Sequence, residues 1–95
     1  MNEAEFRAYA TAESYRAPEP RTQPPNRFFP SHAHDDDLIV LILKGAMTVD
    51  YGARQDSFGP GDMCQVARGV DHTDEFGPNG ASYVLAWRTP TTGIK

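Results

Sequence analysis

Two histidines separated by one residue stand just before the longest apolar run of the chain. They are His32 and His34, in the stretch SHAHDDDLIVLILKG. In a strand, residues i and i+2 project from the same face about 6.6 Å apart, so their imidazoles can converge on one ion with nitrogen–metal distances near ~2.0 Å. The same spacing would also suit a pair of surface histidines beside an acidic loop. A third ligand from elsewhere in the chain must decide between the two interpretations.

Length and composition indicate one domain, over residues 1–95, with many turns. Eight glycines and eight prolines in 95 residues favour short strands over long helices. Thirteen acidic and nine basic side chains give a net charge of −4, and no basic cluster accompanies the aromatic residues, so we expect no nucleic-acid partner. The longest apolar run, Leu38–Leu43, is too short to span a bilayer, so we expect no membrane partner either.

The single cysteine, Cys64, excludes an internal disulfide framework. The first residues, MNEAEFRAY, lack the charged and apolar regions of a signal peptide. Both observations favour a cytoplasmic protein. The sequence shows no pattern that would place a catalytic base beside Cys64. We therefore expect Cys64 to be a small buried hydrophobic residue rather than a nucleophile.

The first third of the chain predicts a helix followed by an extended arm. Good helix formers fill residues 2–13, and Phe6 and Tyr9 share one face, which predicts a short amphipathic helix within a lead-in of residues 1–17. Residues 18–30 contain five prolines and must be extended or irregular. Phe28 and Phe29 in this arm need burial, so we expect a strand edge or a covering arm rather than a disordered linker.

Short strands with turns between them follow over residues 31–88. The apolar run is typical of a strand covered on both faces, and we expect Gly45 to end it. In the last segment, Tyr83, Leu85 and Trp87 share a face. The predicted strands are 38–43, 47–51, 63–67 and 81–88, and the predicted turns are DYGARQ, SFGPGD and FGPNG. This spacing predicts an all-β sandwich or barrel.

The remaining histidine, His72, lies in GPGDMCQVARGVDHTDEF. Here the sequence resembles the cupin superfamily, whose first motif is G-x5-H-x-H-x3-E-x6-G and whose second is G-x5-P-x-G-x2-H-x3-N. His32, His34 and Gly45 fall on positions of the first motif, and Gly61, Gly69 and His72 on positions of the second. The resemblance covers roughly residues 31–76. It implies a cupin-type double-stranded β-helix, an antiparallel barrel or jelly roll with a short N-terminal helix, and a metal site of His32, His34 and His72.

The chain departs from the motifs at the family's carboxylate ligand. Leu38 occupies the position of the glutamate and cannot bind a metal, while Ala67 and Phe76 replace the second motif's proline and asparagine. Strand parity favours Asp36 as a substitute ligand, and register with the motif favours Asp37. For both, a solvated carboxylate on a loop beside the barrel mouth is the simpler interpretation.

Three neutral imidazoles suit iron, zinc, nickel, manganese or copper, so the ligand type does not choose the divalent metal. Three protein ligands also leave open positions for a small anionic or enolisable molecule. The resemblance then implies dioxygenase chemistry as one candidate, and an isomerase or lyase that stabilises an enolate as another.

No catalytic side chain can be assigned from the sequence. Asp74 follows His72 by two residues and would point to the same side of a strand, but a polar loop residue is the simpler interpretation. Tyr51 and Tyr83 could donate hydrogen bonds inside the barrel or serve as core or surface rings.

A non-catalytic module that binds or senses a small molecule is the alternative function, and a vestigial barrel that binds ions adventitiously is a third. We also predict a homodimer, since a small barrel has edge strands to protect and the arm with Phe28 and Phe29 could cover a neighbour's edge.

Overall fold

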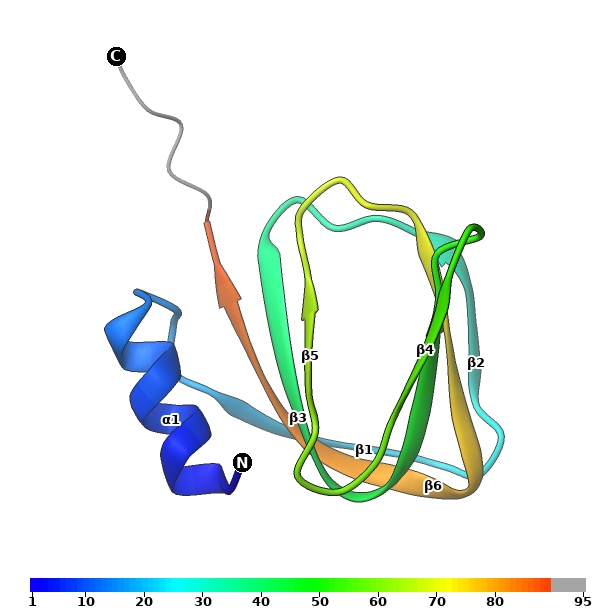
Figure 1. The fold of residues 1–95 in the computed structure, drawn as a ribbon, viewed down its shortest axis with the longest axis horizontal. Coiled ribbons are helices and arrows are strands. Elements are labelled where there is room, and N and C mark those ends of the chain that lie inside the picture. The colour runs from blue at the N-terminus through cyan, green and yellow to red at the C-terminus, as the bar shows by residue number, and fades with distance from the viewer. Residues whose placement is uncertain (90–95) are drawn as a thin grey trace.

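One antiparallel sheet folds back on itself, and one helix lies on its outside (Figure 1). A cavity lies between the two halves of the sheet. A computed structural model describes residues 1–89. The elements are α1 (Glu3–Ala12), β1 (Glu19–Gln23), β2 (Phe28–His32), β3 (Asp37–Asp50), β4 (Gln55–Phe58), β5 (Met63–Val66) and β6 (His72–Arg88). The described part is therefore mostly β, with one N-terminal helix, as the sequence predicts.

The two long strands, β3 and β6, form the spine of both halves of the sheet. They pair antiparallel along nearly their whole length, from Asp37 opposite Arg88 to Asp50 opposite Thr73. In one half, β1 pairs with the C-terminal part of β6, and β5 pairs with the N-terminal part of β3. In the other half, β2 pairs with the N-terminal part of β6, and β4 pairs with the C-terminal part of β3. The two halves enclose the cavity between them.

The halves meet at a corner made by two glycines. Gly45 in β3 has φ +80° and Gly80 in β6 has φ +70°, a conformation that L side chains rarely adopt. A Cβ on Gly45 would collide with the carbonyl oxygen of Gly80, so the two backbones touch. The β3–β6 register shifts on both sides of Gly45. These irregularities let both strands bend without ending.

The corner corrects two predictions. Gly45 does not end its strand, because β3 continues to Asp50. The predicted turn FGPNG lies inside β6, which continues from His72 to Arg88. In both places the glycine permits a bend, and the hydrogen-bonded partner strand carries the chain through it. The predicted turns DYGARQ and SFGPGD are confirmed, since they connect β3 to β4 and β4 to β5.

The helix closes the outer face of one half of the sheet. Asn2 caps α1, accepting from the Glu5 N–H at 2.8 Å, and the Glu5 carboxylate accepts from the Asn2 N–H at 2.8 Å. Phe6 and Ala10 are fully buried, and Tyr9 packs beside them, so the predicted apolar face is confirmed. They pack on side chains of β3 and β6: Ile39, Leu41, Val84 and Ala86.

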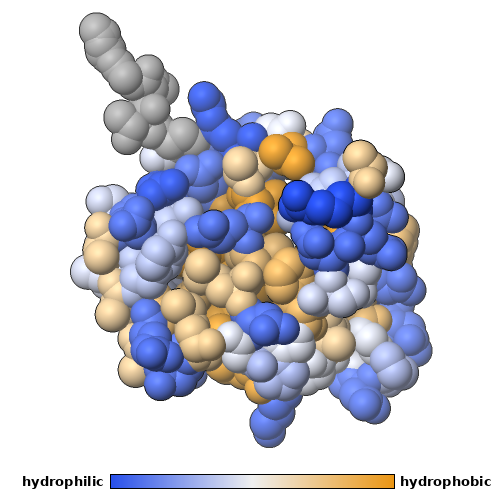
Figure 2. All heavy atoms as spheres, in the orientation of Figure 1, coloured by the Kyte–Doolittle hydropathy of each residue, from blue (hydrophilic) through white to orange (hydrophobic). Residues whose placement is uncertain are grey.

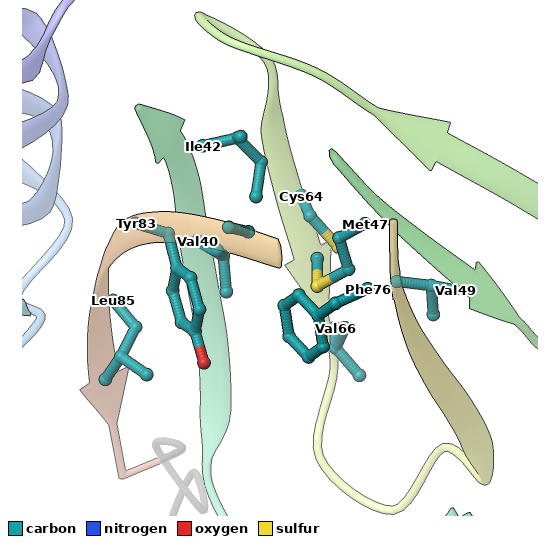
Figure 3. Close-up of a cluster of buried hydrophobic side chains, with 10 residues drawn as sticks. Val40, Ile42, Met47, Val49, Cys64, Val66, Phe76, Tyr83 and Leu85 are labelled. Atoms are coloured by element: carbon teal, nitrogen blue, oxygen red, sulfur yellow. The ribbon is translucent and has the colours of Figure 1, made fainter. Parts of the chain in front are cut away.

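A second apolar cluster faces inward. Its side chains come from β3, β5 and β6 and point toward one another (Figure 3). Phe76 and Tyr83 stack at its centre with ring centroids 5.7 Å apart. The buried members are Val40, Ile42, Met47, Val49, Cys64, Val66, Phe76, Ala81, Tyr83 and Leu85.

The arm predicted at 18–30 forms β1 and β2 and pairs with β6 of its own chain. Phe29 packs against the inner cluster, but Phe28 is 52% exposed, so the burial expected for Phe28 is absent from the described chain. Hydrophobic residues gather in the middle of the face that Figure 2 shows, with hydrophilic residues mostly around them. Among residues 1–89, no helix is long and apolar enough to cross a membrane. The homodimer and the cytoplasmic location stay predictions.

Candidate functional site

The three histidines come together at one end of the barrel. His32 ends β2 and lies opposite His72, the first residue of β6, while His34 follows in the connection to β3. The ring centroids lie 4.4 Å apart for His32 and His72, 4.8 Å for His32 and His34, and 5.2 Å for His34 and His72. One nitrogen of each ring can be chosen so that all three lie within 4.8 Å of one another. The cluster is compatible with a metal site.

Backbone carbonyls orient two of the rings. Nδ1 of His32 lies 2.7 Å from the Pro30 carbonyl oxygen, and Nδ1 of His72 lies 2.9 Å from that of Val70. A carbonyl oxygen only accepts, so Nδ1 donates in both cases. In the neutral imidazole, Nε2 then carries the lone pair. Histidines that bind metals are commonly oriented by this kind of bond.

The three rings differ in burial: His72 is buried, while His32 and His34 are half-buried. His72 is 2% exposed, and His34 packs edge-on against Trp87 with centroids 5.0 Å apart. Burial lowers the pKa of His34, and the neighbouring His32 and His72 lower it further. His34 therefore favours the neutral form, which is the form that binds metals.

A carboxylate completes the polar end of the cavity. Asp74 lies on β6 two residues after His72, so both side chains project to the same side of the strand. Asp74 Oδ2 is 3.5 Å from His32 Nε2, and Asp74 Oδ1 is 3.7 Å from His72 Nε2. Burial raises the pKa of Asp74, and the two histidines partly offset this effect. The polar-loop interpretation of Asp74 is wrong; the i, i+2 spacing to His72 was the signal for its position.

The rest of the cavity is apolar. Its volume is about 490 Å³, and Leu38, at the lost glutamate position, contributes to its wall. The Tyr83 hydroxyl accepts from Gln23 Nε2 at 3.1 Å. The remaining apolar lining includes Phe29, Val40, Met47, Val49, Val66, Phe76, Leu85 and Trp87. A molecule inside this cavity would meet polar groups mainly at the histidine end.

Asp36 and Asp37 are engaged elsewhere. Asp36 pairs with Arg16 at 2.7 Å. Asp37 accepts from the Arg68 backbone N–H at 3.1 Å and from Arg88 Nη2 at 3.0 Å, and these bonds lower its pKa. Neither carboxylate lines the cavity. The structure therefore brings neither of the two suggested substitute ligands to the histidines.

Cys64 belongs to the buried inner cluster, whereas Tyr51 follows the end of β3 near His72. Cys64 is 1% exposed, and burial raises the pKa of its thiol to about 12, so it stays protonated, as expected of a small buried hydrophobic residue. The Tyr51 ring packs against the inner cluster with its centroid 6.3 Å from that of His72.

The model of the AraC-like ligand binding domain family matches residues 20–90. A comparison with curated proteins gives no match.

Similar solved structures agree on the fold. A protein of unknown function from Rhizobium leguminosarum bv. viciae 3841 has a TM-score of 0.73 at 16% identity, covering 78% of this chain and 70% of that one. An RmlC-like cupin from Shewanella frigidimarina NCIMB 400 has a TM-score of 0.67 at 17% identity, covering 80% and 68%. The DMSP lyase DddQ from Ruegeria pomeroyi DSS-3 has a TM-score of 0.68 at 23% identity, covering 82% of this chain and 40% of the lyase. The predicted cupin fold is confirmed.

Proposed function

The chain belongs to the family of AraC-like ligand binding domains, and we propose that it binds a small molecule through a divalent transition metal held by His32, His34 and His72. The observation that carries the proposal is the position of the three imidazoles, which converge at the polar end of an otherwise apolar cavity. Fixed Nδ1 donors on two of the rings support Nε2 as the ligand atom there. Imidazole ligands suit several divalent metals, so they do not determine whether the ion is iron, zinc, nickel, manganese or copper.

The shape and polarity of the cavity describe the bound molecule. An ion on three neutral imidazoles keeps its positive charge and open positions, which favour an anionic, chelating head group such as a carboxylate, an enolate or a thiolate. The apolar walls favour an aliphatic or aromatic body. A polyhydroxylated molecule would leave its hydroxyl groups without partners along these walls.

The test is elemental analysis of protein purified without a histidine tag, for the native chain and for His72→Ala. We expect one metal ion per native chain and a loss of affinity of about 100-fold or more in the variant. Since His72 is buried, His34→Ala serves as a second variant at a less buried ligand, with circular dichroism to check folding. Equal metal content in the native chain and the folded variants would contradict the three-histidine site.

Catalysis by the same centre is a second candidate, favoured by the open positions that three protein ligands leave on the cavity side. A dioxygenase, isomerase or lyase acting on an enolisable molecule would use them, and one protein of similar fold is a DMSP lyase. Turnover distinguishes the candidates. An enzyme must consume a diketone or a thiol in its metal-loaded form and stop after metal removal, whereas a binding module retains the molecule unchanged.

A further inference from the structure

We infer that Asp74 is the carboxylate ligand of this metal, replacing the glutamate whose position is occupied by Leu38. The inference rests on the proposed three-histidine site. Asp74 reaches the histidines from a different strand than the family's glutamate would, since it lies on β6 and Leu38 on β3. Both residues line the same cavity, so a carboxylate from either strand can face the same point.

The distances from Asp74 to two of the three histidines are close to those between ligands that share an ion. Ligand atoms bound to one tetrahedral metal at about 2.0–2.1 Å lie about 3.3–3.4 Å apart. Asp74 Oδ2 and Oδ1 lie 3.5 and 3.7 Å from the Nε2 atoms of His32 and His72. These separations are a few tenths of an ångström longer than the tetrahedral edge. They exceed the usual N–H···O range of about 2.7–3.2 Å, so direct hydrogen bonds do not account for them.

The electrostatics of the facing atoms also call for a cation. Because Nδ1 donates to a backbone carbonyl in His32 and in His72, each neutral ring turns its Nε2 lone pair toward Asp74. The two oxygens of an ionised Asp74, each facing one of these lone pairs, make an arrangement of acceptors without a donor. A metal ion between them gives all of these atoms one partner.

Competing partners for Asp74 are absent among residues 1–89. The neighbouring candidates Asp36 and Asp37 are paired with Arg16 and Arg88, while Asp74 is paired with histidines only among the described residues. Its side chain is 18% exposed, so water screens it weakly. Binding Asp74 would lower the charge of a 2+ centre to +1, which matches a monoanionic head group better than a dianionic one.

The test uses the metal-free full chain and Co²⁺ as the probe. Binding is followed by competition with a chelator and by the visible absorption of the bound ion, which reports its ligands. We expect Asp74→Asn, which keeps the size of the side chain, to lower the Co²⁺ affinity at least about tenfold and to change the absorption spectrum. Asp36→Asn and Asp37→Asn are the matched controls, and neither should change the spectrum.

A double variant tests the ligand role directly. Leu38→Glu should restore much of the Co²⁺ affinity lost in Asp74→Asn, since it returns a carboxylate to the same cavity. If Asp74→Asn does not fold, Asp74→Ser removes the carboxylate with a smaller side chain. Native affinity and spectrum in a folded Asp74 variant would overturn the inference and leave the three-histidine site intact. A native chain that binds no Co²⁺ would overturn both.

Discussion

The two faces of β3 and β6 are both apolar, but only one of them is filled. On the outer face, Ile39, Leu41 and Val84 are covered by the chain's own helix and are at most 1% exposed. On the inner face, Val40 and Leu85 belong to a cluster that borders a cavity of about 490 Å³. Because successive side chains of a strand alternate, the same two strands supply both faces.

The outer face of the two strands contributes mainly to stability, whereas the inner face leaves room for binding. The outer face is covered by Phe6 and Ala10, which pack on Ile39, Leu41 and Val84. The inner face keeps its space, and its polar groups gather at the histidine end. A barrel of this size stabilises its strands from the helix side, which leaves the inside available for a small molecule.

The largest effect should come from shortening one leucine on each face. Leu41→Ala should lower the free energy of unfolding by about 4 kcal/mol, since Leu41 is fully buried under the helix and leaves a closed cavity. Leu85→Ala should cost only about 2 kcal/mol, because Leu85 already borders open space and loses fewer contacts. Urea denaturation of both variants measures the difference. Equal losses would mean that the inner face is packed as tightly as the outer one.

A smaller effect should appear on the inner face alone. Leu38→Glu should raise the metal affinity of the native chain about tenfold, because the new carboxylate would add an anionic ligand at the cavity wall. Chelator competition with Zn²⁺ measures the change. Gln65→Glu, at an exposed residue of β5 that does not line this cavity, is the control for added negative charge. An equal gain in both variants would assign the effect to charge rather than to ligation.

The smallest effect concerns the contacts of Arg88 with Tyr15 and Asp37. Arg88 lies over the Tyr15 ring at 4.4 Å and donates to the Asp37 carboxylate at 3.0 Å. The Arg68 N–H and Arg88 lower the pKa of Asp37 below 3.8, so the stabilisation is complete above that pH and disappears as the pH falls through the lowered pKa. Asp37→Asn should therefore lower Tm by about 1–4 °C near pH 7 and not at all in strong acid.

Thermal melts of Asp37→Asn and the native chain over a pH series check this sign. Asp56→Asn, which breaks the exposed pair with Arg54, is the control for removing a surface carboxylate. A difference in Tm between Asp37→Asn and the native chain that is constant from neutral pH to strong acid would contradict the assignment of the effect to the Asp37 charge.

Much of this fold could be predicted from local patterns. The apolar run at 38–43 indicated a strand with two covered faces, and β3 has them. The spacing of His32, His34 and His72 in two motifs indicated one cluster, and their rings meet. These predictions succeeded because each depended on the period of a strand or on residue positions within a known pattern.

The errors came from features that depend on partners distant in the sequence. Glycine at 45 and at 80 permits a bend, but only the pairing of β3 with β6 shows that the chain does not reverse there. Asp74 seemed a loop residue because the residues around it are polar. One end of the cavity is polar, however, and β6 points Asp74 into it. The i, i+2 spacing of His72 and Asp74 predicted the position of Asp74 correctly, whereas the polar composition of the segment did not.

The pairing scheme has a consequence for the order in which the molecule is made. β1 and β2 have their sheet partners on β6, with Glu19 opposite Leu85 and His32 opposite His72. During synthesis from the N-terminus, these segments leave the ribosome long before their partner exists, so we expect the sheet to close only after residue 88 has emerged. A nascent chain that ends before residue 72 carries two of the histidines and no strand to hold them together. The three histidines would thus come together only after β6 has been made.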